Sequence, residues 1–162
     1  MGACRYTRCR VGRRETEAPK VIIPDLNVLL YAIDRTSPRH EDAHSWLEST
    51  LNDGSEDFGI PFVVHLGFLR LSTSARLFPN PLSVDEACQW LDHVWENPFV
   101  VSVHPGKAHR SILRHLLLGL GTGGNLVTDT HLAALALEND ATVVTGDRDF
   151  QRFPGLKLTL LF

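Results

Sequence analysis

Short apolar runs alternate with longer amphipathic stretches from Val21 to the end of the sequence. Apolar runs rich in β-branched or aliphatic residues predict strands at 21–24, 99–103, 141–145 and 156–162. Apolar residues at helical spacing predict helices over 26–34, 37–51, 83–97, 107–120 and 125–140. Residues 52–59 predict a loop, and residues 60–75 predict a short strand or turn that leads into another helix.

Polar residues mark the starts of two of these helices. Ser37 is expected to cap the second helix, with Pro38 at its first helical position. The S-x-x-E sequence from Ser83 to Glu86 predicts a capping box.

The alternation of strands and helices indicates the fold class. Strands separated by helices of about ten or more residues are typical of βαβ units, whose parallel sheet is covered on both faces. The predicted class is therefore α/β, with one domain over residues 21–162. A chain of 162 residues with 43% hydrophobic side chains is large enough to fill one core.

Charge is distributed unevenly along the chain, whose net charge is −3. Residues 1–20 hold six basic and two acidic side chains, a net charge of +4, so residues 21–162 carry −7. We expect this basic leader to be disordered or to lie upstream of the natural start. The acidic body would need a local basic patch or metal ions to bind nucleic acid.

The composition also bears on the cellular compartment. No apolar run approaches the roughly 18 residues that span a bilayer, and the leader lacks the apolar middle of a secretory signal. Cys4, Cys9 and Cys88 form no CxxC pair, which argues against a disulfide framework and against a zinc knuckle. The sequence predicts a soluble cytoplasmic protein.

Two short motifs match signatures for which the context is wrong. HEDAH, from His40 to His44, fits the H-E-x-x-H zinc pattern but falls in the predicted first turn of a charged helix. GLGTGG, from Gly119 to Gly124, fits G-x-G-x-x-G but follows a helix, whereas a dinucleotide fingerprint follows a strand. We interpret the first as a solvated helix start and the second as a helix end with a flexible loop.

Aspartates follow two predicted strands and begin one predicted helix. Asp25 follows the first strand, Asp147 follows the strand at 141–145, and Asp149 comes two residues later. The last long helix would be capped by Thr128 or Asp129. Because the carboxyl ends of parallel strands share one edge of the sheet, we expect these acids to be neighbours. Each one alone is also explained as a helix cap or an Asx turn.

A cluster of carboxylates points to a cation. Like charges in close proximity raise one another's pKa, so a fold keeps such groups ionised when a cation lies among them. Oxygen donors of this kind suit Mg²⁺, with Mn²⁺ as an alternative, and such ions take further ligands from water and phosphate. A bound metal of this kind activates water and neutralises charge on a phosphodiester.

Three segments occur in the order and spacing of a known family: PDLNVLLYAID, GFLRLST and NLVTDTHLAALALENDATVVTGDRDFQRFPGL. Over residues 21–162 the chain resembles PIN-domain ribonucleases of the VapC toxin type. The resemblance implies a PIN-like three-layer sandwich with a five-stranded parallel sheet. It also implies a divalent-metal-dependent endoribonuclease that forms a homodimer and is neutralised by a VapB-type antitoxin.

The resemblance assigns roles to four acids. It implies that Asp25, Asp129 and Asp147 are the metal ligands and that Asp149 supports the site through water. Asn27 and Thr145 lie close enough in sequence to orient Asp25 and Asp147 by hydrogen bonds.

The chain departs from the family pattern at one position. Many members carry E-x-x-R in the middle helix, and here Gly67 replaces the glutamate while Arg70 keeps its place. We therefore expect one tightly held metal ion, because Gly67 offers no ligand. Glu86 is already explained by the capping box.

Basic side chains are the expected RNA contacts, because guanidinium groups fork onto phosphate. Arg70, Arg148 and Arg152 are the main candidates, and a salt bridge explains Arg148 equally well. Weaker candidates lie on the helix at 107–120: Arg110, Arg114 and His115.

Two other functions remain open at this point. The DLN and TGDRD segments loosely resemble haloacid-dehalogenase phosphatases, in which Asp25 would be the nucleophile. Alternatively, Gly67 marks a decayed PIN scaffold that binds RNA or an antitoxin without cleaving.

Overall fold

The computed structural model describes residues 20–162, so the basic leader, apart from Lys20, lies outside the described residues. In order, the described chain forms β1 (Val21–Pro24), α1 (Leu26–Ile33), α2 (His40–Asp53), β2 (Asp57–Pro61), α3 (Phe62–Ser72), α4 (Val84–Trp95), β3 (Val100–Val103), α5 (His109–Leu120), α6 (Leu126–Glu138), β4 (Thr142–Thr145), a 3₁₀ helix η1 (Arg148–Arg152) and β5 (Lys157–Leu160).

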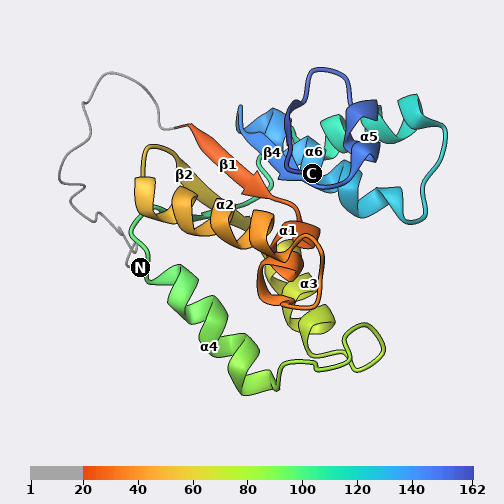
Figure 1. Cartoon of the computed structure of the whole chain (residues 1–162). Helices are drawn as coiled ribbons and strands as arrows, with labels where there is room; N and C mark the ends of the chain where they lie inside the picture. The colour runs from red at the N-terminus through yellow and green to blue at the C-terminus, as the bar shows by residue number, and fades with distance from the viewer. Residues whose placement is uncertain (1–19) are drawn as a thin grey trace, which may run out of the picture.

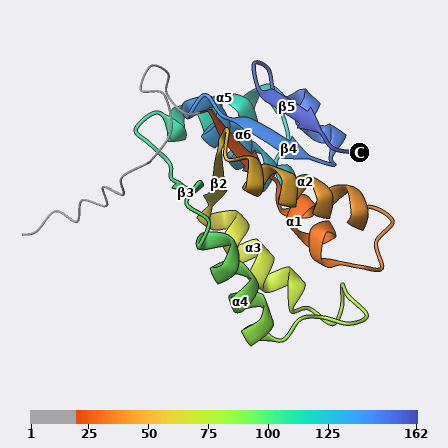
Figure 2. The ribbon, with the colours of Figure 1, turned by 60° about the vertical axis from the view of Figure 1, so that its left-hand side comes forward.

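The strands of the described chain form one parallel sheet of five in the order β3-β2-β1-β4-β5. β1 lies in the centre, paired with β2 on one side and β4 on the other. The chain steps from β1 to β3 in one direction and then returns to β4. Right-handed crossovers therefore place α1 to α4 on one side of the sheet and α5 and α6 on the other, as Figures 1 and 2 show. The predicted α/β class and five-stranded parallel sheet are confirmed.

The core lies between the central strands and the helices on both faces. Ile23 and Val143 are 0% exposed and Phe58 is 1% exposed. α6 is buried around most of its circumference, because residues 132–136 are at most 1% exposed. Burial on both faces explains why the central strands β1 and β4 have continuous apolar sequences rather than alternating ones.

Two predicted boundaries are wrong. α2 begins at His40, and Ser37 instead closes a turn, accepting the His40 N–H at its carbonyl (3.1 Å) and the Arg39 N–H at its Oγ (3.2 Å). β2 begins at Asp57, inside the stretch predicted as a loop, because the Asp57 N–H bonds the Lys20 carbonyl (2.8 Å) beside β1. Pairing with the central strand thus extends β2 beyond its local apolar signal.

Other local predictions are confirmed. Ser83 and Glu86 form the capping box at the start of α4, with Glu86 Oε2 accepting the Ser83 N–H (2.8 Å) and Ser83 Oγ accepting the Glu86 N–H (3.2 Å). α5 ends at Gly121, whose φ of 65° is in the left-handed region. Within the described residues no helix is long and apolar enough to cross a membrane.

The H-E-x-x-H motif lies in the first turn of α2, as expected. His40 Nδ1 is 3.2 Å from the Tyr31 carbonyl oxygen, and Glu41 and His44 are exposed. Phe68 of α3 belongs to the core: it is 0% exposed and stacks on Trp90, with ring centroids 4.4 Å apart. Trp46 and Trp95 pack partly buried against the same core.

Candidate functional site

Asp25 lies at the carboxyl end of β1, where the strand turns into α1. Its Oδ1 accepts the Leu26 N–H (2.7 Å), so it caps α1 as local sequence reasoning allowed. Its backbone N–H bonds the Val144 carbonyl (2.8 Å), which fixes it beside β4. The side chain is 7% exposed, and burial raises its pKa, with Thr145 and Leu26 opposing this by hydrogen bonds and Asp147 adding to it by charge.

Asn27 and Thr145 hold the second oxygen of Asp25. The Thr145 hydroxyl donates to Asp25 Oδ2 (2.6 Å), and Asn27 Nδ2 donates to the same oxygen (2.6 Å). Thr145 Oγ1 also accepts the Asp147 N–H (2.9 Å), so one buried hydroxyl links the two aspartates. The expected orienting hydrogen bonds are therefore present, and Thr145 serves both acids.

Asp147 and Asp149 lie where β4 passes into η1. Asp147 Oδ1 accepts the Asp149 N–H (2.8 Å), which is the Asx turn considered from the sequence. The Gly146 N–H donates to Asn27 Oδ1 (3.3 Å), which ties the turn to the start of α1. Asp149 Oδ1 pairs with Arg152 at 3.2 Å.

Asp129 is within α6 rather than at its cap. The helix begins at Leu126, because the Gly123 and Gly124 carbonyls already accept backbone N–H groups there. The Asp129 carboxyl has its pKa raised to about 6, first by burial and then by the charges of Asp25, Asp147 and Asp149. These four side chains, the acid cluster, are thus electrostatic neighbours at one edge of the sheet.

The acid cluster offers only oxygen donors. Among residues 20–162, no three Asp, Glu, His or Cys side chains already stand in positions to hold a metal ion. The donor set nevertheless suits a hard divalent cation. Burial is the larger cause of the raised pKa of Asp129, and a cation would relieve the further part that comes from the neighbouring carboxylates.

Gly67 lies on α3 against Leu26. A β-carbon added at Gly67 would be 2.5 Å from Leu26 Cδ2, so Leu26 fills the space into which a side chain at position 67 would extend. Glu86 is exposed, and hydrogen bonds from Ser83 lower its pKa, in keeping with its role as a cap.

The three predicted RNA-binding arginines differ in position. Arg148 and Arg152 belong to η1, directly after Asp147, and both are exposed. Arg70 is exposed in the last turn of α3. In the described chain neither Arg70 nor Arg148 makes an ion pair, so the salt-bridge explanation of Arg148 is wrong.

Sequence reasoning missed Phe162. A β-carbon at Gly146 would collide with the Phe162 ring, so this ring lies over the turn that carries Asp147. The ring also makes an edge contact with Tyr31 at 5.5 Å and lies under the Arg39 guanidinium at 4.6 Å. A terminal apolar residue carries no motif, so no local signal could have identified this contact.

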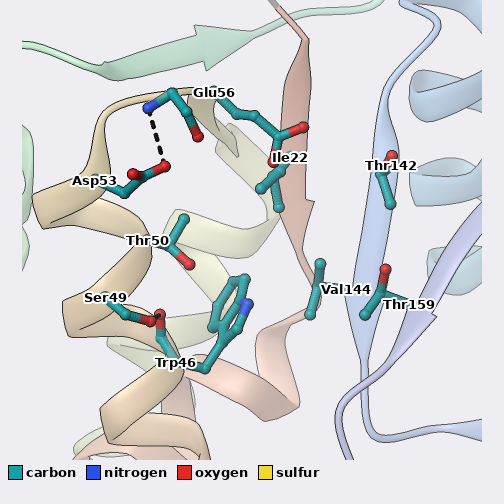
Figure 3. A pocket seen from close by; sticks show the side chains of 10 residues that line it. Ile22, Trp46, Ser49, Thr50, Asp53, Glu56, Thr142, Val144 and Thr159 are labelled. Atoms are coloured by element: carbon teal, nitrogen blue, oxygen red, sulfur yellow. Dashed lines mark hydrogen bonds between the residues drawn. The ribbon is translucent and has the colours of Figure 1, made fainter.

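A separate hollow of about 570 Å³ lies between α2 and strands β1, β4 and β5 (Figure 3). Its charged lining residues are Asp53, whose Oδ2 accepts the Ser55 N–H (3.3 Å), and Glu56. Both precede β2 and therefore lie at the amino edge of the sheet, opposite the acid cluster. Two negative charges and no basic group make this hollow unsuitable for an RNA backbone.

The carboxylates gather at the carboxyl edge of a five-stranded parallel sheet. This combination of topology and site is the one that defines the class of protein to which the chain belongs. The PIN domain family matches residues 22–156, and the chain belongs to this family. The phosphatase alternative is therefore set aside.

The relatives narrow the class to the VapC ribonucleases. Ribonuclease VapC37 of Mycobacterium tuberculosis is 42% identical, covering 83% of this chain and 93% of its own length. Ribonuclease VapC33 of the same organism is 40% identical, covering 86% of this chain and 96% of its own length. A solved structure of VapBC2 from Rickettsia felis, bound to a promoter DNA fragment, contains a chain of similar fold, with a TM-score of 0.63 and 20% sequence identity. The match covers 86% of this chain and 98% of that chain, and it supports the fold.

Proposed function

We propose that this chain cleaves RNA with a divalent metal ion held by Asp25, Asp129 and Asp147, and that Asp149 supports the ion through water. As a member of the VapC family, the chain is the ribonuclease toxin of a toxin–antitoxin system. The observation that supports the metal site is the gathering of four carboxyl groups at one edge of the sheet, where burial and then the charges of Asp25, Asp147 and Asp149 raise the pKa of Asp129 to about 6. Mg²⁺ fits the all-oxygen donors best, and Mn²⁺ is the alternative.

The bound ion would activate a water molecule and neutralise charge on the phosphodiester. The protein's own task is to hold the carboxylates in place. Thr145 and Asn27 fix one oxygen of Asp25 and the Leu26 N–H fixes the other, so Asp25 cannot rotate away (2.6, 2.6 and 2.7 Å). Gly67 supplies no further acid, which supports a site with one tightly held ion.

RNA would reach the acid cluster through basic side chains beside it. Arg148 and Arg152 are exposed on η1, within five residues of Asp147 in the sequence. Their guanidinium groups would bind phosphates that flank the cleaved bond. Arg70, exposed in the last turn of α3, is the third proposed RNA contact.

The partners follow from the family. A VapB-type antitoxin is the proposed protein partner, supported by the VapBC2 complex among the structural neighbours. We further propose a homodimer that acts in the cytoplasm and whose functional unit is residues 21–162.

The test is RNA cleavage by purified Asp25→Asn protein in the presence of Mg²⁺. We expect at least a roughly 100-fold loss of rate, because a ligand is lost outright where weaker supporting changes already cost about 10–100-fold. Asp92→Asn is the matched control, because Asp92 is exposed on α4 and is distant in the sequence from every member of the acid cluster. Circular dichroism would confirm that both variants fold.

Cleavage by Asp25→Asn within about threefold of the unsubstituted protein would overturn the proposed site. Cleavage that persists in excess EDTA would overturn metal dependence. If neither variant nor the original protein cuts RNA, the scaffold without catalysis becomes the better description.

A further inference from the structure

A small hollow lies beside the acid cluster, between the end of α5 and the segment that follows η1. Its volume is about 250 Å³, and we call it the α5 pocket. Its apolar lining comes from Leu116, Leu120, Phe153 and Pro154, and its polar lining from His115 and Arg152. Leu116 and Phe153 are each 4% exposed, so they form a well-packed apolar floor of the pocket.

One ion pair joins this pocket to the acid cluster. Arg152, which lines the pocket, pairs with Asp149 Oδ1 at 3.2 Å. Asp149 in turn donates its backbone N–H to Asp147 Oδ1 (2.8 Å), and Asp147 is one of the proposed metal ligands. The pocket therefore adjoins the place where a scissile phosphate would sit.

The pocket has the chemistry of a nucleobase site. Single-stranded RNA is recognised when unstacked bases enter sites that combine an apolar or aromatic surface with hydrogen-bonding groups. The pocket, at about 250 Å³, is smaller than typical small-ligand pockets of about 300–1,000 Å³, so it suits one flat ring system rather than a larger ligand. Exposed Arg152 and His115 at its rim complement the anionic backbone that a base brings with it.

The contrast with the larger hollow in Figure 3 supports this occupant. That hollow has Asp53 and Glu56 as its charged residues, both at the amino edge of the sheet. The α5 pocket has basic lining groups and is adjacent to the carboxylates. Only the α5 pocket, of these two, has both the charge and the location that an RNA nucleotide requires.

We propose that the α5 pocket receives one unstacked nucleobase of the RNA, from a nucleotide adjacent to the cleaved bond. Arg152 binds the phosphate of that nucleotide, and His115 forms a hydrogen bond with the edge of the nucleobase. The apolar side chains of the pocket pack against the nucleobase ring. This inference rests on the proposed ribonuclease function and adds to it a site that determines sequence preference.

A substitution that fills the pocket provides the test. Gly119 lines the pocket, and a β-carbon there meets nothing within 4 Å, so the backbone leaves room for a side chain at this position and Gly119→Phe is the filling substitution. Leu118→Phe is the matched control: Leu118 is the neighbouring residue on α5, 66% exposed and outside the pocket. Thermal unfolding would show that both variants are folded.

The probe is an oligoribonucleotide that the unsubstituted protein cleaves, prepared as a set with one abasic site at each position in turn. We expect one abasic position beside the cut to lower kcat/KM about tenfold, as loss of a stacked base does. Gly119→Phe should lower kcat/KM on the intact RNA by about the same factor and remove the sensitivity to that abasic position. Leu118→Phe should keep both the rate and the sensitivity.

Binding of the same set is measured in parallel by fluorescence anisotropy with Asp25→Asn protein, with and without Gly119→Phe. If cleavage proceeds but no abasic position alters kcat/KM or Kd, the nucleobase site is wrong while the ribonuclease function stands. The same conclusion follows if Gly119→Phe leaves both quantities unchanged. If RNA is bound but not cut, the function fails, and the abasic dependence of Kd alone decides whether the pocket binds a base.

Discussion

Asp129→Asn removes one charge from the acid cluster and nearly preserves the shape of the side chain. In the ion-free protein, Asp129 is held near Asp25, Asp147 and Asp149, and its pKa is raised to about 6 by burial and by their charges. The substitution should therefore stabilise the ion-free fold at neutral pH. It should also remove the stabilisation that Mg²⁺ gives to the original protein.

The size of the expected stabilisation follows from the rise in the pKa of Asp129. A rise from 3.8 to about 6 corresponds to about 3 kcal/mol, at about 1.36 kcal/mol per pH unit. Because Asp129 is only half-buried, solvent screening reduces this to about 1–2 kcal/mol. For a domain of this size, that is a rise in Tm of roughly 3–6 °C.

The dependence on pH has a definite sign. The folded protein holds the Asp129 proton more tightly than the unfolded chain does, so the folded state binds more protons between about pH 4 and pH 6. The free energy of unfolding of the ion-free protein therefore falls as pH rises through this window. The loss is complete above about pH 6, and Asp129→Asn should lack it.

The assay is thermal and urea unfolding at about pH 5 and pH 7.5, in EDTA and in Mg²⁺. Asp92→Asn serves as the control for a charge removed from an exposed site. In Mg²⁺ the original protein should gain stability as RT ln(1 + [Mg²⁺]/Kd), and Asp129→Asn should gain much less. If Asp129→Asn is destabilised equally at both pH values in EDTA, the carboxylates do not repel one another and the reasoning is refuted.

Three further predictions concern the support of Asp25, the glycine at position 67 and the capping box of α4. Asn27→Ala should lower Mg²⁺ affinity about 10–100-fold, measured by calorimetry, because Asn27 Nδ2 fixes Asp25 (2.6 Å), and unchanged affinity would contradict this. Gly67→Glu should cost about 1–3 kcal/mol in urea unfolding, because the new side chain meets Leu26 at 2.5 Å. Adding Leu26→Ala should recover part of that loss, and its failure to do so would refute the steric explanation. Ser83→Ala should lower the free energy of unfolding by about 1 kcal/mol and leave the rate of RNA cleavage unchanged. Glu86→Gln should also leave this rate unchanged, and a loss of rate would indicate a metal role for Glu86.

Local sequence patterns predicted most of the elements because their causes are local. The capping box at Ser83 depends on residues three apart, and the strand at 141–145 on a run of β-branched side chains. The starts of α2 and α6 were misplaced within local turns, whereas the start of β2 was missed because a distant segment decides it. β2 extends to Asp57 because Lys20 offers a carbonyl at 2.8 Å, and no pattern within 52–59 contains that information.

The sequence by itself determined the types of chemistry that this protein can support. Asp25 and Asp147 were identifiable as acids at strand ends, since the parallel arrangement of strands follows from alternation with helices. Only the tertiary structure decided how these acids are held. Thr145 is 120 positions from Asp25 and bonds it at 2.6 Å, Phe162 packs over Gly146, and Arg152 reaches both Asp149 and the α5 pocket. Such contacts depend on the order of strands in the sheet, which is set by packing of the whole core and not by any single segment.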